Sequence, residues 1–283
     1  MKAIVAITAY DRIDLLERCL ISLSNNDQSL FHVCVYPDMV SDAVYNEIES
    51  VCVSVCKSSG MFIRLFSRPD KRLYCCRNIL HSLETSSSLE PEFIIKLDGD
   101  LLVAKDFVKV MLSFSQACNG GFVTSSIICP MPFREKCRLS GNAVYGSLSG
   151  SNFAVSKTWW DKIAGTADPL IRKMQPIDGS APDHNKDWAH LKTIATASNP
   201  TNPGAKLGRK YFLSDEMNTG SDAIIVLGAA VCDCPISSLV VNRVIHPSPI
   251  GAHTTPEFHA AHYANTFLDE IPGDDTRTEF AWQ

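Results

Sequence analysis

Apolar and polar positions follow two different periods along the first part of the chain. Short runs rich in Ala, Val, Ile and Phe have no polar face, which is typical of strands that are buried on both sides. We expect such strands at residues 3–9, 31–36, 61–67 and 93–100. The segments between them space their apolar residues by three or four positions, and Asp11 is available to cap the first of these helices. This alternation predicts an α/β fold, with a mostly parallel twisted sheet flanked by helices.

The pattern is looser beyond about residue 115. We expect a strand at 122–128, a strand entering a helix at 151–165, loop-like chain at 165–202 with a helical interruption at 187–195, and a strand at 237–246. The change of pattern separates a first half at 1–110 from a second half at 111–253 and an acidic tail at 254–283.

Polar and charged residues come directly after the predicted strands. In parallel α/β sheets, ligands bind beyond the carboxyl ends of the strands, so these positions are expected to share one rim of the sheet. The rim would collect Thr8, Tyr10, Arg12, Asp38, residues 68–72, Asp98 and Asp100.

The fourth strand ends in two carboxylates separated by a glycine, Asp98-Gly99-Asp100. Asp-Gly is also a common turn signal, so the triplet has a purely structural interpretation. Alternatively, the glycine permits a tight turn in which both carboxylates face one hard divalent cation, which also accepts oxygens from a diphosphate. Mg²⁺ or Mn²⁺ held there would neutralise the charge that grows on a leaving phosphate.

Four short polar segments follow the four predicted strands in order: TAYDR after the first strand, YPD after the second, CRN after the third and DGD after the fourth. Together they resemble the motifs of GT-A glycosyltransferases, and most closely the family 2 group. The resemblance covers residues 1–110 well and is patchier afterwards. It implies a GT-A, Rossmann-like fold with a nucleotide-sugar-binding half at 1–110 and an acceptor-binding, catalytic half at 111–253. The implied donor is a nucleotide-diphospho-sugar, with a UDP-sugar favoured.

The same resemblance suggests roles for individual residues of the first half. It implies that Tyr10 lies against the nucleobase and that Asp38 accepts a hydrogen bond from it. The other residues implied in binding the donor nucleotide are Thr8, Arg12, Arg77 and Asp98. Asp98 and Asp100 would hold the metal ion.

Carboxylates in the second half are candidates for the catalytic base. The family has a Glu-Asp pair at the start of a helix, and its aspartate is the base of an inverting displacement. Here the order is inverted, Asp215-Glu216, and we favour Glu216. Asp187, which precedes a tryptophan, is a second candidate. A carboxylate within reach of a sugar hydroxyl can take its proton, although any of these acids could instead cap a helix.

A histidine follows the last predicted strand. His246 lies thirty-one residues after Asp215 and resembles the histidine that completes the metal shell in several metal-dependent GT-A enzymes. Imidazole accepts manganese more readily than magnesium, which favours Mn²⁺. His253 is a competing ligand, and a lone histidine after a strand is also a common hydrogen-bonded core residue.

Composition restricts the setting of the chain. Of its residues, 45% are hydrophobic, yet no stretch approaches the roughly 18 apolar residues of a membrane helix, and the N-terminus does not resemble a signal peptide. We expect a soluble cytoplasmic protein, which for a viral protein means the host cytoplasm. The 11 cysteines are an odd number and lack the paired C-x-x-C spacing of structural zinc sites, so we expect reduced thiols.

Partners other than the donor are less constrained. A net charge of -5 makes no general case for nucleic acid, but basic clusters at 134–138 and 206–210 keep a modified nucleic acid base open as the acceptor, beside a glycan or a protein. A sugar-nucleotide nucleotidyltransferase is disfavoured because TAYDR has no glycine-rich loop for a triphosphate. A non-catalytic nucleotide- or carbohydrate-binding module is the rival from another class.

Overall fold

The computed structural model describes residues 2–125, 139–140, 143–145, 152–174, 188–213, 221–239, 243–245 and 247. Most of the described strands join one sheet, and the remaining two form a small separate ribbon. The strands of the large sheet are β1 (Ala3–Ala9), β2 (Phe31–Pro37), β3 (Ile63–Leu65), β4 (Phe93–Asp98), β6 (Phe122–Thr124), β7 (Leu139–Ser140), β8 (Ala143–Tyr145), β9 (Asn152–Ser156) and β10 (Ile236–Leu239). The ribbon pairs β5 (Leu102–Val103) with β11 (Val244–Ile245).

The large sheet has the order β3-β2-β1-β4-β9-β6-β10-β8-β7. The first four strands in this order are parallel, and β9 runs antiparallel to both β4 and β6. In the register of β1, Thr8 lies opposite Tyr36 of β2 and Asp98 of β4. The carboxyl ends of these three strands are therefore level, so the chain that follows each of them reaches the same rim.

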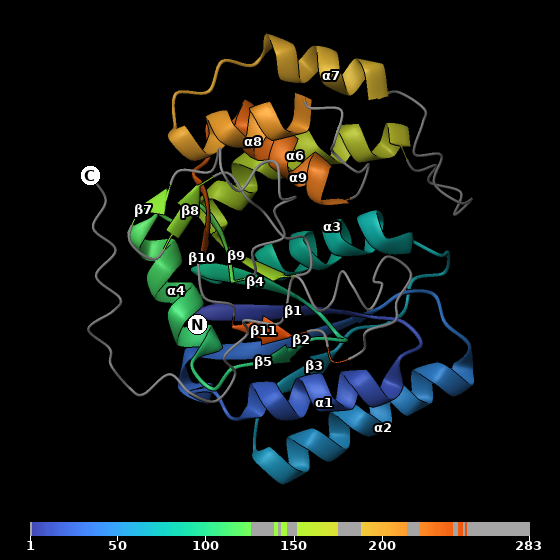
Figure 1. Cartoon of the computed structure of the whole chain (residues 1–283). Helices are drawn as coiled ribbons and strands as arrows, with labels where there is room; N and C mark the ends of the chain where they lie inside the picture. Colours follow the sequence, from blue (N-terminus) through green and yellow to red (C-terminus); the bar gives the residue numbers. More distant parts are fainter. Residues whose placement is uncertain are drawn as a thin grey trace.

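Helices cover both faces of the sheet (Figure 1). One face carries α1 (Ile13–Ser24), α2 (Asp42–Ser59) and α4 (Phe107–Ala117), and the other carries α3 (Tyr74–Ser87), α6 (Lys157–Met174), α8 (Pro203–Leu213) and α9 (Ser221–Val231), with α7 (Trp188–Ala197) outermost. A short 3-10 helix, η1 (Gln28–Leu30), precedes β2. Along β1, Val5 and Ile7 enter one core and Ile4 and Ala6 the other. Two covered faces explain why the strand has no polar side.

Local signals set the ends of the elements in the first half, with two corrections. Ser41 accepts a hydrogen bond from the backbone of Val44 and begins α2, and Gly60, with φ of 74°, ends it. Asp11 does not cap α1, because the helix begins after Arg12 and has no side-chain cap. The third strand is shorter than the expected 61–67, since β3 is an edge strand that pairs with β2 over only three residues.

The second half departs further from the sequence-based expectation. Chain expected to be loop-like from residue 165 is helical to Met174, because α6 continues through Gly165 and Pro169 while its inner face, with Trp160 and Ile163, packs into the core. The strand expected at 237–246 is wrong as a single element. Its start belongs to β10, which pairs with β6 and β8, whereas β11 pairs with β5. The apolar pattern of a segment does not specify which strands its two ends will pair with.

Some expectations fall on chain that the structure leaves undescribed, including the acidic tail at 254–283. Among the helices that are described, none has the length and apolar character needed to span a lipid bilayer. The cysteines whose side chains are described, at positions 19, 34, 52, 56, 118, 232 and 234, are free thiols.

Candidate functional site

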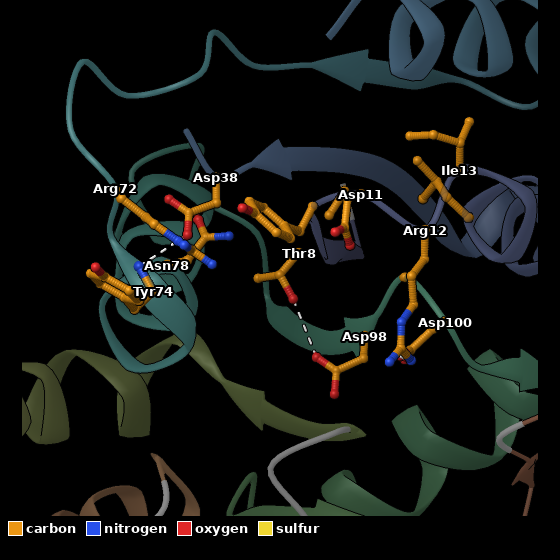
Figure 2. Close-up of a pocket in the computed structure, with 14 residues that line it drawn as sticks. Thr8, Asp11, Arg12, Ile13, Asp38, Arg72, Tyr74, Asn78, Asp98 and Asp100 are labelled. Carbon is orange, nitrogen blue, oxygen red and sulfur yellow. Dashed lines mark hydrogen bonds and ion pairs between the residues drawn. The ribbon is translucent and has the colours of Figure 1, made fainter. Parts of the chain in front are cut away.

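A cavity of about 470 Å³ lies at the rim where β1, β2 and β4 end. Its size is within the range of small-molecule sites. It is lined by Thr8, Ala9, Tyr10, Asp11, Arg12, Ile13, Leu16, Asp38, Arg72, Tyr74, Asn78, Asp98, Gly99 and Asp100. The cavity has two ends (Figure 2): one gathers Asp38, Arg72, Tyr74 and Asn78, and the other gathers Arg12, Asp98 and Asp100, with Thr8 between them.

The carboxylate of Asp98 is held by two side chains. Thr8 donates from Oγ1 to Asp98 Oδ1 at 3.2 Å, and the ammonium of Lys96 also donates to Oδ1. Lys96 is fully buried, so this ion pair compensates a charge that the core could not otherwise contain. The interactions fix the direction in which Asp98 faces the cavity.

Cys19 lies behind this strand end, and its thiol contacts the backbone carbonyl of Asp98 at 3.8 Å. Burial, together with the charges of Asp100 and Asp98, raises the pKa of the Cys19 thiol far above its usual range. The thiol is therefore held in its protonated form.

Gly99 answers why a glycine separates the two aspartates. Its backbone N–H donates to the carbonyl oxygen of Thr8 at 3.1 Å. A Cβ at this position would lie 2.9 Å from that same oxygen and 3.2 Å from a methyl group of Leu16. Only glycine allows β4 to turn this close to β1, and the turn keeps both carboxylates at the rim.

Asp100 lies across the mouth of the cavity from the first strand. Arg12 donates from Nη1 to Asp100 Oδ2 at 2.8 Å, and both side chains are partly exposed. Arg12 precedes α1 and Asp100 follows β4, so the ion pair joins segments 88 residues apart in the sequence.

Asp38 holds the loop between β3 and α3. Its Oδ1 accepts from the backbone N–H groups of Met39 and Leu73, both at 2.7 Å, and its Oδ2 accepts from the N–H of Tyr74 at 3.0 Å. The side chain is buried. The structure thus gives Asp38 a structural task besides the expected contact with a nucleobase, which stays a prediction.

Two residues at this end, Tyr74 and Asn78, were not among the residues expected at the rim, whereas Arg72 belongs to the expected stretch 68–72. The guanidinium of Arg72 lies 4.7 Å from the ring centres of both Tyr10 and Tyr74. Asn78 is buried and lines the cavity. All three lie in or beside the quoted CRN segment and the loop before it, but only contacts with β1 and β2 show that they face the cavity.

Arg77, by contrast, does not belong to the cavity lining. It lies on α3, one turn before His81, and burial together with its charge lowers the pKa of His81. The expected donor contact of Arg77 stays a prediction.

The candidates of the second half cannot be placed. Asp187, Asp215, Glu216, His246 and His253 lie outside the described residues. Within the part of the chain that is described, no group of three or more His, Cys, Asp or Glu side chains is arranged to hold a metal ion. Asp98 and Asp100 therefore supply two carboxylates at most to such a site there.

Comparison with protein families decides the class. Residues 4–165, more than half of the chain, match the family described as Glycosyl transferase family 2. The chain belongs to this family. The match confirms the resemblance inferred from the four motifs and the expected glycosyltransferase class. None of the curated protein sequences matches the chain.

The family match and one solved structure confirm the GT-A fold class. The mannosyltransferase PcManGT from Pyrobaculum calidifontis, in complex with GDP-Man and Mn²⁺, has a TM-score of 0.51 at 15% identity, covering 81% of this chain and 73% of its own. TarS 1-349 from S. aureus has a TM-score of 0.47 at 13% identity, covering 82% of this chain and 71% of its own. The chain spans 30% of another TarS structure and 47% of TarS 1-349 in complex with UDP-GlcNAc.

Proposed function

We propose that this glycosyltransferase moves a sugar from a nucleoside diphosphate, with UDP favoured, to an acceptor hydroxyl with the help of a divalent metal ion. One observation carries the proposal: the Asp98-Gly99-Asp100 turn lines the same cavity as Tyr10 and Asp38. One nucleoside diphosphate could therefore place its nucleobase against Tyr10 and Asp38 and its diphosphate, with a metal ion, against Asp98 and Asp100.

The two ends of the cavity suit the two parts of such a donor. Tyr10 offers an exposed ring at the end where Asp38 and Asn78 lie, which suits a nucleobase. Thr8 lies between that end and the carboxylates (Figure 2). Arg12, at the far end, would attract the diphosphate, and its partial exposure leaves it access to an incoming anion.

Asp98 and Asp100 would hold the metal ion. Mg²⁺ and Mn²⁺ prefer oxygen ligands, and such ions are commonly bound by one or two carboxylates completed by substrate phosphates. The bound ion would neutralise negative charge on the departing diphosphate. Lys96 and Thr8 orient Asp98 for this task, and Arg12 orients Asp100. His246 would complete the shell and favour Mn²⁺ over Mg²⁺.

The transfer step itself belongs to the second half of the chain. We assign residues 1–110 to donor binding and 111–253 to acceptor binding and catalysis. Glu216, with Asp215 and Asp187 as alternatives, would remove the proton of the acceptor hydroxyl while the sugar inverts. We do not assign this role to Asp98 or Asp100, because Lys96 and Arg12 pair with them.

Release of free UDP from UDP-sugars in the presence of Mn²⁺ tests the proposal. We expect slow release by the wild type, no release by Asp100→Ala, and unchanged release by Glu17→Ala, which removes an exposed carboxylate of α1. Retained nucleotide binding without turnover of any donor would contradict the proposal and favour a non-catalytic binding module.

The acceptor is proposed to be a glycan, a protein or a modified nucleic acid base. For nucleic acid, the cluster at 206–210 supplies two exposed cations on α8, Lys206 and Lys210. Its third cation, Arg209, donates to the backbone carbonyls of Ala195 and Thr196 at the end of α7, so it is already engaged. DNA binding that weakens steeply as salt rises would favour the nucleic acid, and a flat salt response would exclude it.

A further inference from the structure

Each carboxylate at the end of β4 already has a cationic partner. Lys96 donates to Asp98, and Arg12 donates from Nη1 to Asp100 Oδ2 at 2.8 Å. Figure 2 shows the guanidinium of Arg12 against Asp100, at the end of the cavity away from Arg72. The two ion pairs balance the charges of the two carboxylates, so neither is offered uncompensated to a bare Mn²⁺ ion.

The two cationic partners differ in whether they can leave. The side chain of Lys96 is fully buried, so no water can receive its ammonium and it stays with Asp98. The side chain of Arg12 is 41% exposed and that of Asp100 is 25% exposed. An ion pair this accessible to solvent contributes little to stability and can be exchanged for another partner. The pairing of Asp98 is therefore fixed, whereas that of Asp100 is reversible.

Such an exchange needs no movement of the backbone. The carbonyl oxygen of Arg12 accepts from the N–H of Leu16 at 3.0 Å, which fixes Arg12 at the start of α1. On one side of Asp100, the N–H of Gly99 donates to β1 at 3.1 Å, and on the other, the N–H of Val103 donates to a serine of α1 at 3.1 Å. Both backbone positions are thus held, and only the side chain of Arg12 has to change its rotamer.

The proposed function gives the two members of this ion pair different ligands. Asp100 would bind the metal ion, and Arg12 would bind the diphosphate. While they contact each other, the guanidinium repels a metal ion from Asp100, and the carboxylate repels a diphosphate from Arg12. A diphosphate that arrives with its metal ion satisfies both groups at once, because a guanidinium pairs with phosphate as well as with carboxylate.

We propose that Arg12 occupies Asp100 until the donor arrives and then transfers to the diphosphate, so that the chain takes up the metal ion together with the nucleoside diphosphate. This inference deepens the proposed function and rests on it. By linkage, the exchange makes each of the two ligands strengthen the binding of the other. Removing one member of the ion pair should then favour the ligand of the remaining member.

Arg12→Gln tests the metal side of the exchange. The measurement is Mn²⁺ binding to the full chain without nucleotide, followed by the EPR signal of free Mn²⁺. We expect Arg12→Gln to bind Mn²⁺ about threefold or more tightly than the wild type, because Asp100 is released from the guanidinium. Unchanged or weaker Mn²⁺ binding by this variant would overturn the exchange and leave Arg12 the role of orienting Asp100.

Arg18→Gln is the matched control for the metal side. Arg18 is an exposed cation on α1 and lies outside the cavity lining. Its replacement removes the same charge without releasing Asp100, so the variant should bind Mn²⁺ as the wild type does. Equal tightening by Arg18→Gln and Arg12→Gln would indicate a general effect of net charge and would overturn the exchange.

Asp100→Asn tests the diphosphate side. The measurement is calorimetric binding of UDP to the full chain in the presence of EDTA. We expect the variant to bind UDP about threefold or more tightly than the wild type, because Arg12 is released from the carboxylate. Glu17→Gln, which removes an exposed carboxylate of α1 outside the cavity lining, should leave this affinity unchanged. Unchanged or weaker UDP binding by Asp100→Asn would overturn the exchange.

The outcomes separate this inference from the proposed function, because both tests measure binding and not transfer. The expected changes in affinity without release of UDP from any UDP-sugar would overturn the proposed function and leave the exchange standing. Release of UDP by the wild type, with unchanged affinities in Arg12→Gln and Asp100→Asn, would overturn the exchange alone. A wild type that binds neither Mn²⁺ nor UDP, separately or together, would overturn both.

Discussion

The ammonium of Lys96 is fully buried and donates to the carboxylate of Asp98, whose side chain remains one third exposed to solvent. The pair lies two residues apart on β4 and points along the same face of the sheet. The strand is otherwise apolar, and its one fully buried charge, that of Lys96, positions Asp98, the first carboxylate of the rim.

Removal of Lys96 is expected to destabilise the fold. Lys96→Met should lower the free energy of unfolding by about 1–3 kcal/mol, less than for a completely buried pair because solvent still reaches Asp98. A double-mutant cycle with Asp98→Asn, measured by urea denaturation, should give a coupling of at least about 1 kcal/mol.

The pair Lys157 and Asp161 is the matched control for this cycle. It joins positions i and i+4 on the surface of α6 at 2.7 Å. Its coupling should be much smaller than that of Lys96 with Asp98, because both partners are accessible to water. Additive effects of Lys96→Met and Asp98→Asn would contradict the prediction.

Asp38→Asn should loosen the loop before α3. The variant amide keeps one acceptor oxygen but presents an N–H where the N–H of Tyr74 now donates. We expect the free energy of unfolding to fall by about 1–3 kcal/mol and the amide hydrogens of Leu73 and Tyr74 to exchange faster.

Hydrogen exchange followed by NMR checks the Asp38 prediction. Asp14→Asn, which changes an exposed carboxylate in the first turn of α1, should leave the exchange of both amides unchanged. Unaltered exchange at Leu73 and Tyr74 in Asp38→Asn would show that the carboxylate does not hold the loop.

Gly99→Ala should strain the turn between the two rim carboxylates. The new Cβ would meet the backbone oxygen of Thr8 at 2.9 Å, and backbone cannot move aside as a flexible side chain can. We expect a loss of about 1–3 kcal/mol in the free energy of unfolding, together with weaker Mn²⁺ binding in a titration.

Gly165→Ala is the control for this substitution. Gly165 lies in α6, and an added Cβ there has nothing within 4 Å. Because alanine favours a helix over glycine, the variant should be up to about 1 kcal/mol more stable. Equal thermal stability of the Gly99→Ala variant and the wild type would refute the close approach of β1 and β4.

Stability should depend on pH through Asp233. Its partial burial acts to raise its pKa, but the hydrogen bonds from Thr201 and Asn202 outweigh this and lower the pKa of Asp233 below its usual value. A lowered folded-state pKa means that the stabilisation is fully present above the ordinary aspartate pKa of about 4 and is lost as the pH falls through the folded-state value.

Asp233→Asn checks the sign. The wild type should be more stable than the variant at about pH 6, and the difference should shrink towards about pH 3. Stability is measured by urea denaturation at each pH. Asn202, whose N–H donates to Asp233, in turn accepts hydrogen bonds from the backbone N–H groups of Gly204 and Ala205, so loss of the Asp233 contact should also loosen the start of α8. A difference that grows as the pH falls would contradict the assignment.

The first half of the fold was predictable because its signals are local. The β1, β2 and β4 strands lie within two residues of their expected bounds, since runs without a polar face have few alternatives to a covered parallel strand. The rim positions followed from the rule that ligands bind beyond the carboxyl ends of such strands. The second half was less predictable because burial of one face of α6 outweighed the glycine and proline within it.

Within the candidate site, the sequence predicted where the acidic residues lie better than it predicted which side chains contact them. Asp98 and Asp100 lie at the rim as expected, but no pattern in the sequence indicated that Lys96 and Arg12 would contact them. Arg77 was expected to bind the donor because it belongs to the CRN motif, and residues 68–72 were expected at the rim. In the structure, the cavity is lined by Arg72, which lies in the loop before α3, and not by Arg77, which lies within the helix.

The amino-acid sequence by itself determined the alternation of strands and helices, the level rim of acidic and aromatic residues, and the family to which the chain belongs. Periodicity and short motifs are properties of neighbouring residues, so they survive without coordinates. Only the tertiary structure decided that Asp38 accepts a hydrogen bond from a loop 35 residues away and that Arg12 and Lys96 pair with the two carboxylates of the rim. Such contacts depend on which strands pair and in what register, and no local pattern encodes that choice.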